Sequence, residues 1–245
     1  MRVTIGLMFL AFVSARALAQ DWEVTMIFID DYLIDEAFEV ALARSAAPAH
    51  ISEKADVWVL RRDGYHQVAA GTNGFTCLVE RSWSSPVGPH RDFFNPKLRA
   101  PICYNEEAAR TILGDYLRRT ELAMGGSTIG EIQETIEREI GTGKLPPPRG
   151  VAMSYMLSDG QLLGTETGRF KPHLMFYIPY ATSVELGSPP PGCEHVCLFE
   201  HAGGPFAALI VPMPSFNEVS SPEPETRGES SGARYAVISS VRATK

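Results

Sequence analysis

Cysteine is scarce in this sequence, with 4 residues in a chain of 245. A chain of this length can build a hydrophobic core, so disulfides would add to that core and would not replace it. Long apolar runs are also missing after the N-terminus, where no stretch approaches the ~20 residues of a membrane-spanning helix. The sequence therefore predicts a single globular domain with no transmembrane segment.

Positive charge is in deficit as well. Lys and Arg total 22 against 29 for Asp and Glu, which gives a formal charge of -7. The basic pairs Arg61-Arg62 and Arg118-Arg119 both have acidic neighbours. Proteins that bind nucleic acids or anionic membranes need a basic surface. The composition therefore argues against both kinds of partner.

The first 19 residues have the features of a secretory signal peptide. Arg2 supplies a positive charge, residues 5–13 form a short apolar run, and Ala17-Leu18-Ala19 is an A-x-A cleavage site. We predict that residues 1–19 are removed and that the mature chain begins at Gln20. Loss of the two arginines in this leader changes the formal charge from -7 to -9. The predicted location is the periplasm or the extracellular space.

Several elements are predicted from local patterns. Apolar residues recur at helical spacing over residues 30–47, with Asp30 or Asp31 as the N-cap. Asp63-Gly64 indicates a type I′ hairpin turn between two strands. Two further helices are predicted to begin at Asn105 and at the capping box Thr128-x-x-Glu131. The stretch VAMSYML predicts a strand that ends at the turn Ser158-Asp159-Gly160. The stretches HLMFYIPYA and FAALIVPM are apolar and β-rich and predict central or well-covered strands.

This order of strands, helices and more strands predicts an α+β domain over residues 20–245, with a mostly antiparallel sheet and helices packed on one face. A profilin-like arrangement fits this order, and other topologies fit it too. We predict a long loop at 81–101, a proline-rich excursion at 187–204 and a mobile polar segment at 217–234. Residues 235–241, YAVISSV, are predicted to form a final strand that returns to the sheet.

The stretch CEHVCLFEH contains the atom types of a zinc or copper site. Its candidate ligands are Cys193, His195, Cys197 and His201. Their spacing differs from that of zinc fingers and ribbons, and an exported protein meets oxidants that join cysteines. A Cys-x-x-x-Cys loop can close when it is not helical, and the preceding prolines disfavour a helix. A Cys193–Cys197 disulfide is therefore favoured, with the metal site kept as an alternative.

Five short motifs occur in an order that resembles a group of exported bacterial hypothetical proteins of no established activity. The motifs are SAAP at 45–48, GTNGFTC at 71–77, PICYNEEA at 101–108, AMSYML at 152–157 and KPHLM at 171–175. The resemblance covers about half of the chain and implies export and a Cys77–Cys103 disulfide. It transfers no catalytic residue, cofactor or partner. The CEHVC loop and the polar tail depart from the shorter pattern of the group.

His173, at the start of an apolar strand, is the best candidate for a general base, with Asp159 or Asn73 to orient it. The alternative role is a strand-end histidine that bonds to the backbone, which we favour because no nucleophile motif lies nearby. Ser154 is not in a G-x-S-x-G elbow.

Two hypotheses about function follow. The first is a non-catalytic exported domain, without a cofactor, that binds a small ligand or an envelope protein. The second is a hydrolase that uses His173 with the corner that begins at Gly71 and ends at Cys77. A metal-binding role through the CEHVC region is a further alternative.

Overall fold

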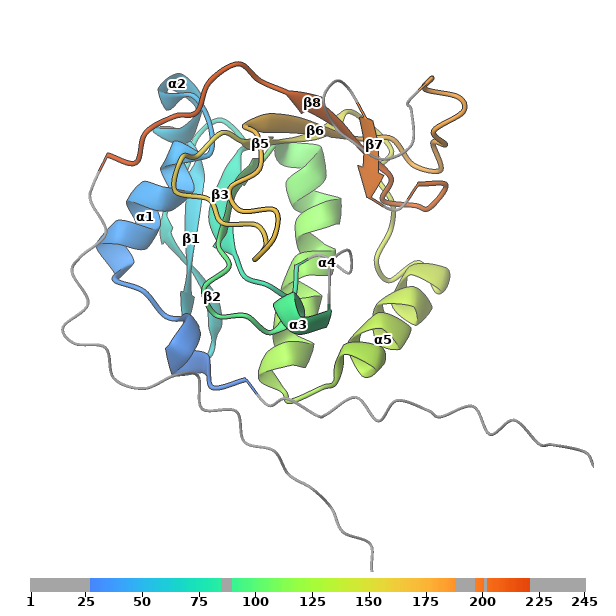
Figure 1. Ribbon diagram of the computed structural model, residues 1–245, viewed down its shortest axis with the longest axis horizontal. Helices are drawn as coiled ribbons and strands as arrows, with labels where there is room; N and C mark the ends of the chain where they lie inside the picture. Colours follow the sequence, from blue (N-terminus) through green and yellow to red (C-terminus); the bar gives the residue numbers. More distant parts are fainter. Residues whose placement is uncertain (1–26, 85–89, 188–196, 201, 221–245) are drawn as a thin grey trace, which may run out of the picture.

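The computed structural model describes residues 27–84, 90–187, 197–200 and 202–220 (Figure 1). The predicted leader, the CEHVC residues Cys193 and His195, His201 and the predicted strand at 235–241 lie outside the described residues. The helical elements are η1 (Ile29–Tyr32), α1 (Glu36–Ser45), α2 (Ala49–Ser52), α3 (His90–Phe93), α4 (Glu106–Met124) and α5 (Ile129–Gly141). The strands are β1 (Asp56–Arg61), β2 (Gly64–Ala69), β3 (Thr76–Glu80), β4 (Ala100–Tyr104), β5 (Ala152–Met156), β6 (His173–Tyr177), β7 (Cys197–Glu200) and β8 (Ala208–Pro212).

Local capping determines where the two long helices begin. The Asn105 side chain accepts a hydrogen bond from the Ala108 N–H at the start of α4. Both bonds of the predicted capping box between Thr128 and Glu131 are present at the start of α5. Each bond satisfies an N–H group that has no partner within its helix. Both predicted helix starts are confirmed.

The predicted helix over residues 30–47 begins later than expected. Asp35 is the N-cap of α1, and its side chain accepts a hydrogen bond from the Phe38 N–H. Asp30 and Asp31 lie instead in the short 3-10 helix η1. The aspartates at both places satisfy the same sequence pattern, because any of them can cap a helix.

The predicted hairpin is present, but its turn is placed one residue earlier. Arg61 pairs with Gly64, so Arg62 and Asp63 form the turn between β1 and β2. Gly64, with a φ of 125°, is the first residue of the returning strand. Glycine reaches this backbone conformation at little cost, whereas residues with a β-carbon do not.

All eight strands form one sheet in the order β2-β1-β3-β4-β5-β6-β8-β7. Only β1 and β3 pair in parallel among these neighbours; the other pairs are antiparallel. Two expected loops contain regular structure. The region 81–101 includes α3 and the start of β4, and the excursion at 187–204 includes β7. At the start of the segment 217–234, Asn217 is held to Leu157, and the rest from residue 221 lies outside the described residues.

The α+β class is confirmed, but the helices do not all lie on one face of the sheet. In β3, Cys77 and Val79 belong to an apolar cluster with Phe38 and Leu42 of α1. The residue between them, Leu78, belongs to a second cluster that includes α4 and α5. Successive side chains of a strand point to opposite faces. Helices α1 and α4 therefore cover opposite faces, as Figure 1 shows around β3.

A disulfide joins Cys77 of β3 to Cys103 of β4, which face each other in the antiparallel register. This agrees with the pair that the resemblance implied. Cys197 is also disulfide-bonded, while its predicted partner Cys193 lies outside the described residues. Of the helices described, none is both long and apolar enough to cross a membrane.

Candidate functional site

Strands β5, β6 and β8 carry apolar side chains on both faces. The apolar side chains that point toward α4 belong to the buried core, and they include Ala152, Met156, Met175, Tyr177, Ala208 and Ile210. The alternate residues, which point to the other side, are half-buried: Met153, Tyr155, Leu174, Phe176, Leu209 and Val211. A strand with one face in water normally alternates apolar with polar residues. Apart from the Tyr155 hydroxyl, these six side chains are apolar, so this side lacks the alternation that is typical of a solvent-facing sheet.

The strand register arranges these side chains in two rows. Met153 lies opposite Phe176, which lies opposite Leu209. Tyr155 lies opposite Leu174, which lies opposite Val211. Adjacent strands are about 4.8 Å apart, and residues two apart on a strand are separated by about 7 Å. The six side chains therefore form one continuous apolar patch.

Two more exposed residues extend this patch at one end of the strands. Ala152 pairs with Tyr177, so the next pair outward is Val151 and Ile178. Their exposed fractions are 75% and 36%. We call the combined surface the open face, which consists of Val151, Met153, Tyr155, Leu174, Phe176, Ile178, Leu209 and Val211.

No helix in the described part of the chain builds its apolar cluster on the open face. The cluster around α1 includes residues of β2, β1, β3 and β4, and it reaches no farther than Tyr155 of β5. The other seven residues of the open face are absent from both apolar clusters of the described structure. Figure 1 shows α1 beside β1 and β3, whereas α4 runs on the opposite side next to β5. The open face is therefore an apolar part of the sheet surface that no helix of the described structure covers.

The structure does not bring the candidate catalytic residues together. His173 lies in the row of Met156, Ile102 and Leu78. Thr76 lies in the neighbouring row, with Tyr104 and Ser154. Asn73 comes three residues before Thr76, so it lies beyond that row, on the side away from His173. The Asn73 amide donates to the Ile51 carbonyl and accepts from the Phe75 N–H, so it holds the corner at 71–77. Asp159 accepts a hydrogen bond from the Val219 N–H.

His173 has the environment of a structural residue. Its side chain is buried, and Nδ1 lies 2.7 Å from the Lys171 carbonyl oxygen. The ring packs edge-on against Phe170. Burial disfavours the charged imidazolium and lowers the pKa of His173 below its usual value. These contacts support the strand-end role, and they offer no support for the hydrolase alternative.

The proposed metal ligands cannot be assembled from the described residues. Cys197 is in a disulfide, and Cys193, His195 and His201 lie outside the described residues. Within the described part of the chain, no group of three or more His, Cys, Asp or Glu side chains is placed to hold a metal ion.

A buried ionic cluster that the sequence did not predict lies beside β3. The Arg81 guanidinium is buried and donates to Glu39 Oε1 at 2.9 Å, to the Tyr32 carbonyl at 3.0 Å and to the Val79 carbonyl. The Tyr116 hydroxyl accepts from the Arg81 backbone N–H. Burial raises the pKa of Glu39, partly offset by the Arg81 charge. Each side-chain nitrogen of Arg81 donates at least one hydrogen bond, and the cluster joins α1, β3 and α4.

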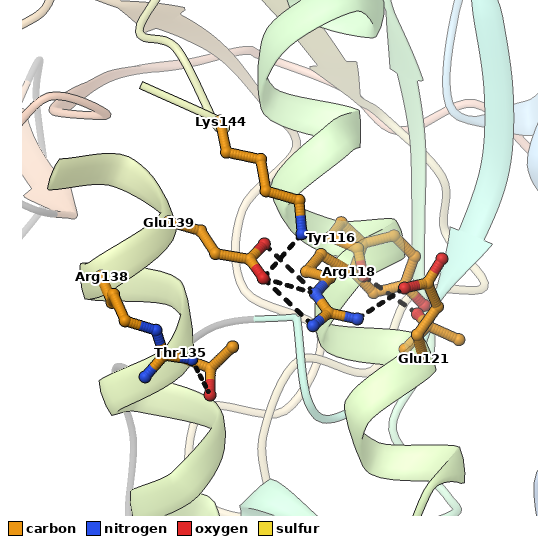
Figure 2. Close-up of polar contacts among 8 residues, drawn as sticks. Tyr116, Arg118, Glu121, Thr135, Arg138, Glu139 and Lys144 are labelled. Atoms are coloured by element: carbon orange, nitrogen blue, oxygen red, sulfur yellow. Dashed lines mark hydrogen bonds and ion pairs between the residues drawn. The ribbon is translucent and has the colours of Figure 1, made fainter. Parts of the chain in front are cut away.

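A second polar cluster joins α4 to α5, as Figure 2 shows. The Glu139 carboxylate accepts from Arg118 Nε at 3.1 Å and from Lys144 Nζ at 2.8 Å. Arg118 also reaches Glu121 at 2.8 Å. Burial tends to raise the pKa of Glu139, but the hydrogen bonds from Lys144 and Arg118 outweigh it, and the pKa is lowered. The contacts fix the angle of the α4–α5 hairpin.

Scans against protein-family models, curated proteins and solved structures found no match to this chain. The open face is therefore the feature of the described structure that best indicates a function. Its signal in the sequence is the run of apolar residues in HLMFYIPYA and FAALIVPM. That pattern predicted central or well-covered strands, but it did not show that one of the two sides lacks a helix.

Proposed function

We propose that this chain is an exported, non-catalytic domain that binds an apolar segment of a partner protein on the open face. The observation that carries this proposal is the continuous patch of eight apolar side chains on β5, β6 and β8 and at their ends. Export is supported by the predicted leader and by the Cys77–Cys103 disulfide, since disulfides persist in oxidising compartments.

The size of the open face favours a short segment as the ligand. Three strands about 4.8 Å apart and five residues at about 3.3 Å each define a surface of roughly 240 Å². A stable protein–protein interface buries about 800 Å² on each partner. The face is therefore too small to hold a folded partner by itself, whereas one extended strand or one helix would cover it.

The expected affinity is modest. Burial of roughly 240 Å² of apolar surface contributes about 6 kcal/mol at ~25 cal/mol per Å². The ligand buries a similar area, but association and ordering of the segment cost about 4–15 kcal/mol. Binding in the micromolar to millimolar range follows, which suits a transient contact.

Photochemical cross-linking in the exporting cell tests this proposal. Phe176→p-benzoylphenylalanine places the probe on the open face, and Phe28→p-benzoylphenylalanine is the matched control at an exposed phenylalanine outside it. We expect a discrete adduct from position 176, mapped by mass spectrometry to an apolar segment of its partner and lost when Leu209→Lys is added. The same set of adducts from both positions, or an adduct that survives Leu209→Lys, would contradict the proposal.

A further inference from the structure

We infer that residues 235–241 of this chain, YAVISSV, bind the open face and compete there with the partner segment. This inference rests on the proposed function, because it assigns a second, intramolecular occupant to the same surface. Three observations carry it: where the described chain ends, the length of the tail and the chemistry of the segment.

The described chain ends on the same side of the sheet as the open face. Asn217 donates a hydrogen bond from Nδ2 to the Ser45 carbonyl at the end of α1. Val219 packs against the apolar cluster of α1, and Tyr155 of the open face packs against the same cluster. The described chain therefore ends on the side of the sheet that carries the open face.

The intervening residues 221–234 are long enough to reach the face. They are rich in Ser, Pro, Glu and Gly, and a random coil of this length has a root-mean-square span of about 20 Å. That span exceeds the radius of gyration of a domain of this size, about 16 Å. A tether of this kind gives an effective concentration in the millimolar range.

The segment itself matches the surface. Residues 235–241 include Tyr235, Val237, Ile238 and Val241, and they are bounded by Arg234 and Arg242. Seven extended residues span about 23 Å, which covers the length of the open face. β-Branched residues such as Val237 and Ile238 fit a pleated, half-buried surface.

A titration with a synthetic peptide tests this inference. Fluorescein-labelled YAVISSV is added to the full mature chain and to the full chain carrying Val237→Asp and Ile238→Asp, and binding is followed by fluorescence anisotropy. A tethered segment with a Kd of about 0.1 mM at an effective concentration near 1 mM weakens external binding roughly tenfold. We expect the double variant to bind the peptide about tenfold more tightly than the unaltered chain.

Control variants define the site. Ser230→Asp and Ser231→Asp make the same charge change in the linker, and they should leave peptide binding at the unaltered level. Adding Phe176→Lys to the double variant should abolish saturable binding, whereas adding Phe28→Lys should not. Thermal melts establish that each variant is folded, and Leu209→Lys replaces Phe176→Lys if that variant is not.

The outcomes separate this inference from the proposed function. Equally tight binding by the unaltered chain and the double variant would overturn the intramolecular contact and leave the open face standing as a binding surface. Absence of saturable binding to every variant would overturn the inference, while the cross-linking experiment decides the proposed function independently. Binding that persists with Phe176→Lys would place the peptide elsewhere and overturn the inference.

Discussion

Phe176 and Leu209 lie opposite each other on adjacent antiparallel strands, on the side of the sheet away from α4. Met175, the residue before Phe176, points to the other side and is buried in the core. Met175 and Phe176 are thus neighbours in one strand, but one faces the core and the other faces the open face. Substitution of each by the same residue tests this assignment of the two sides.

Phe176→Lys should change the free energy of unfolding by less than about 1.5 kcal/mol, because the lysine ammonium can reach water from the open face. Met175→Lys should lower it by more than about 3 kcal/mol, because an unpaired charge would be placed in the core. Urea titrations of the two variants give both values. A large loss for Phe176→Lys would show that this side is firmly covered.

His173→Ala should alter how stability depends on pH. The folded pKa of His173 is lowered by burial, so the unfolded chain takes up its proton first as the pH falls from about 6.5. The free energy of unfolding of the unaltered protein should therefore decline in that range, and the variant should lack this component. Above pH 7 we expect the substitution to cost about 1–2 kcal/mol, through one lost hydrogen bond and a small cavity. Parallel stability profiles from pH 5 to 8 would contradict this prediction.

Removal of the Cys77–Cys103 disulfide with Cys77→Ala and Cys103→Ala should lower the free energy of unfolding by about 3 kcal/mol. The two cysteines are separated by 26 residues in sequence, and closure of a loop of this length restricts the unfolded chain by about that amount. Denaturant titrations measure the loss. Peptide mapping of the unreduced protein should recover this pair separately from the predicted Cys193–Cys197 pair, and a 77–193 or 103–197 peptide would refute the scheme.

Glu139→Gln should loosen the α4–α5 hairpin at a cost of about 1 kcal/mol near neutral pH. The Glu139 side chain is only 9% exposed and bonds both Arg118 and Lys144. Its pKa is lowered on folding, so this stabilisation is present above pH ~4.5 and is lost as the pH falls through the folded pKa. Glu121→Gln is the matched control on the exposed side of Arg118, with an expected cost below about 0.5 kcal/mol. Equal costs for the two variants, measured by denaturant titration, would contradict this account.

The mature protein should begin at Gln20, because the Ala17-Leu18-Ala19 site precedes it. The intact mass of the protein recovered from the exporting cell checks this prediction. Retention of residues 1–19 in the recovered protein would contradict the export argument.

The sequence by itself determined the elements that depend on near neighbours. Asn105 and the pair Thr128 and Glu131 mark helix starts because an N-cap bonds an N–H group three residues away. The N-cap of α1 was ambiguous in the sequence, because Asp30, Asp31 and Asp35 are all possible caps. Only the packing of Phe38 and Leu42 against the sheet selects Asp35.

Only the tertiary structure decided which side of the sheet each helix covers. The order of strands and helices along the chain does not specify this choice, because it depends on contacts between residues far apart, such as Cys77 with the α1 cluster and Leu78 with the α4 cluster. The apolar residues Leu174 and Phe176 predicted covered strands, but a local pattern cannot show what does the covering. With α1 over β1, β3 and β4, and α4 on the opposite side, the open face was left as the surface without a helix in the described structure.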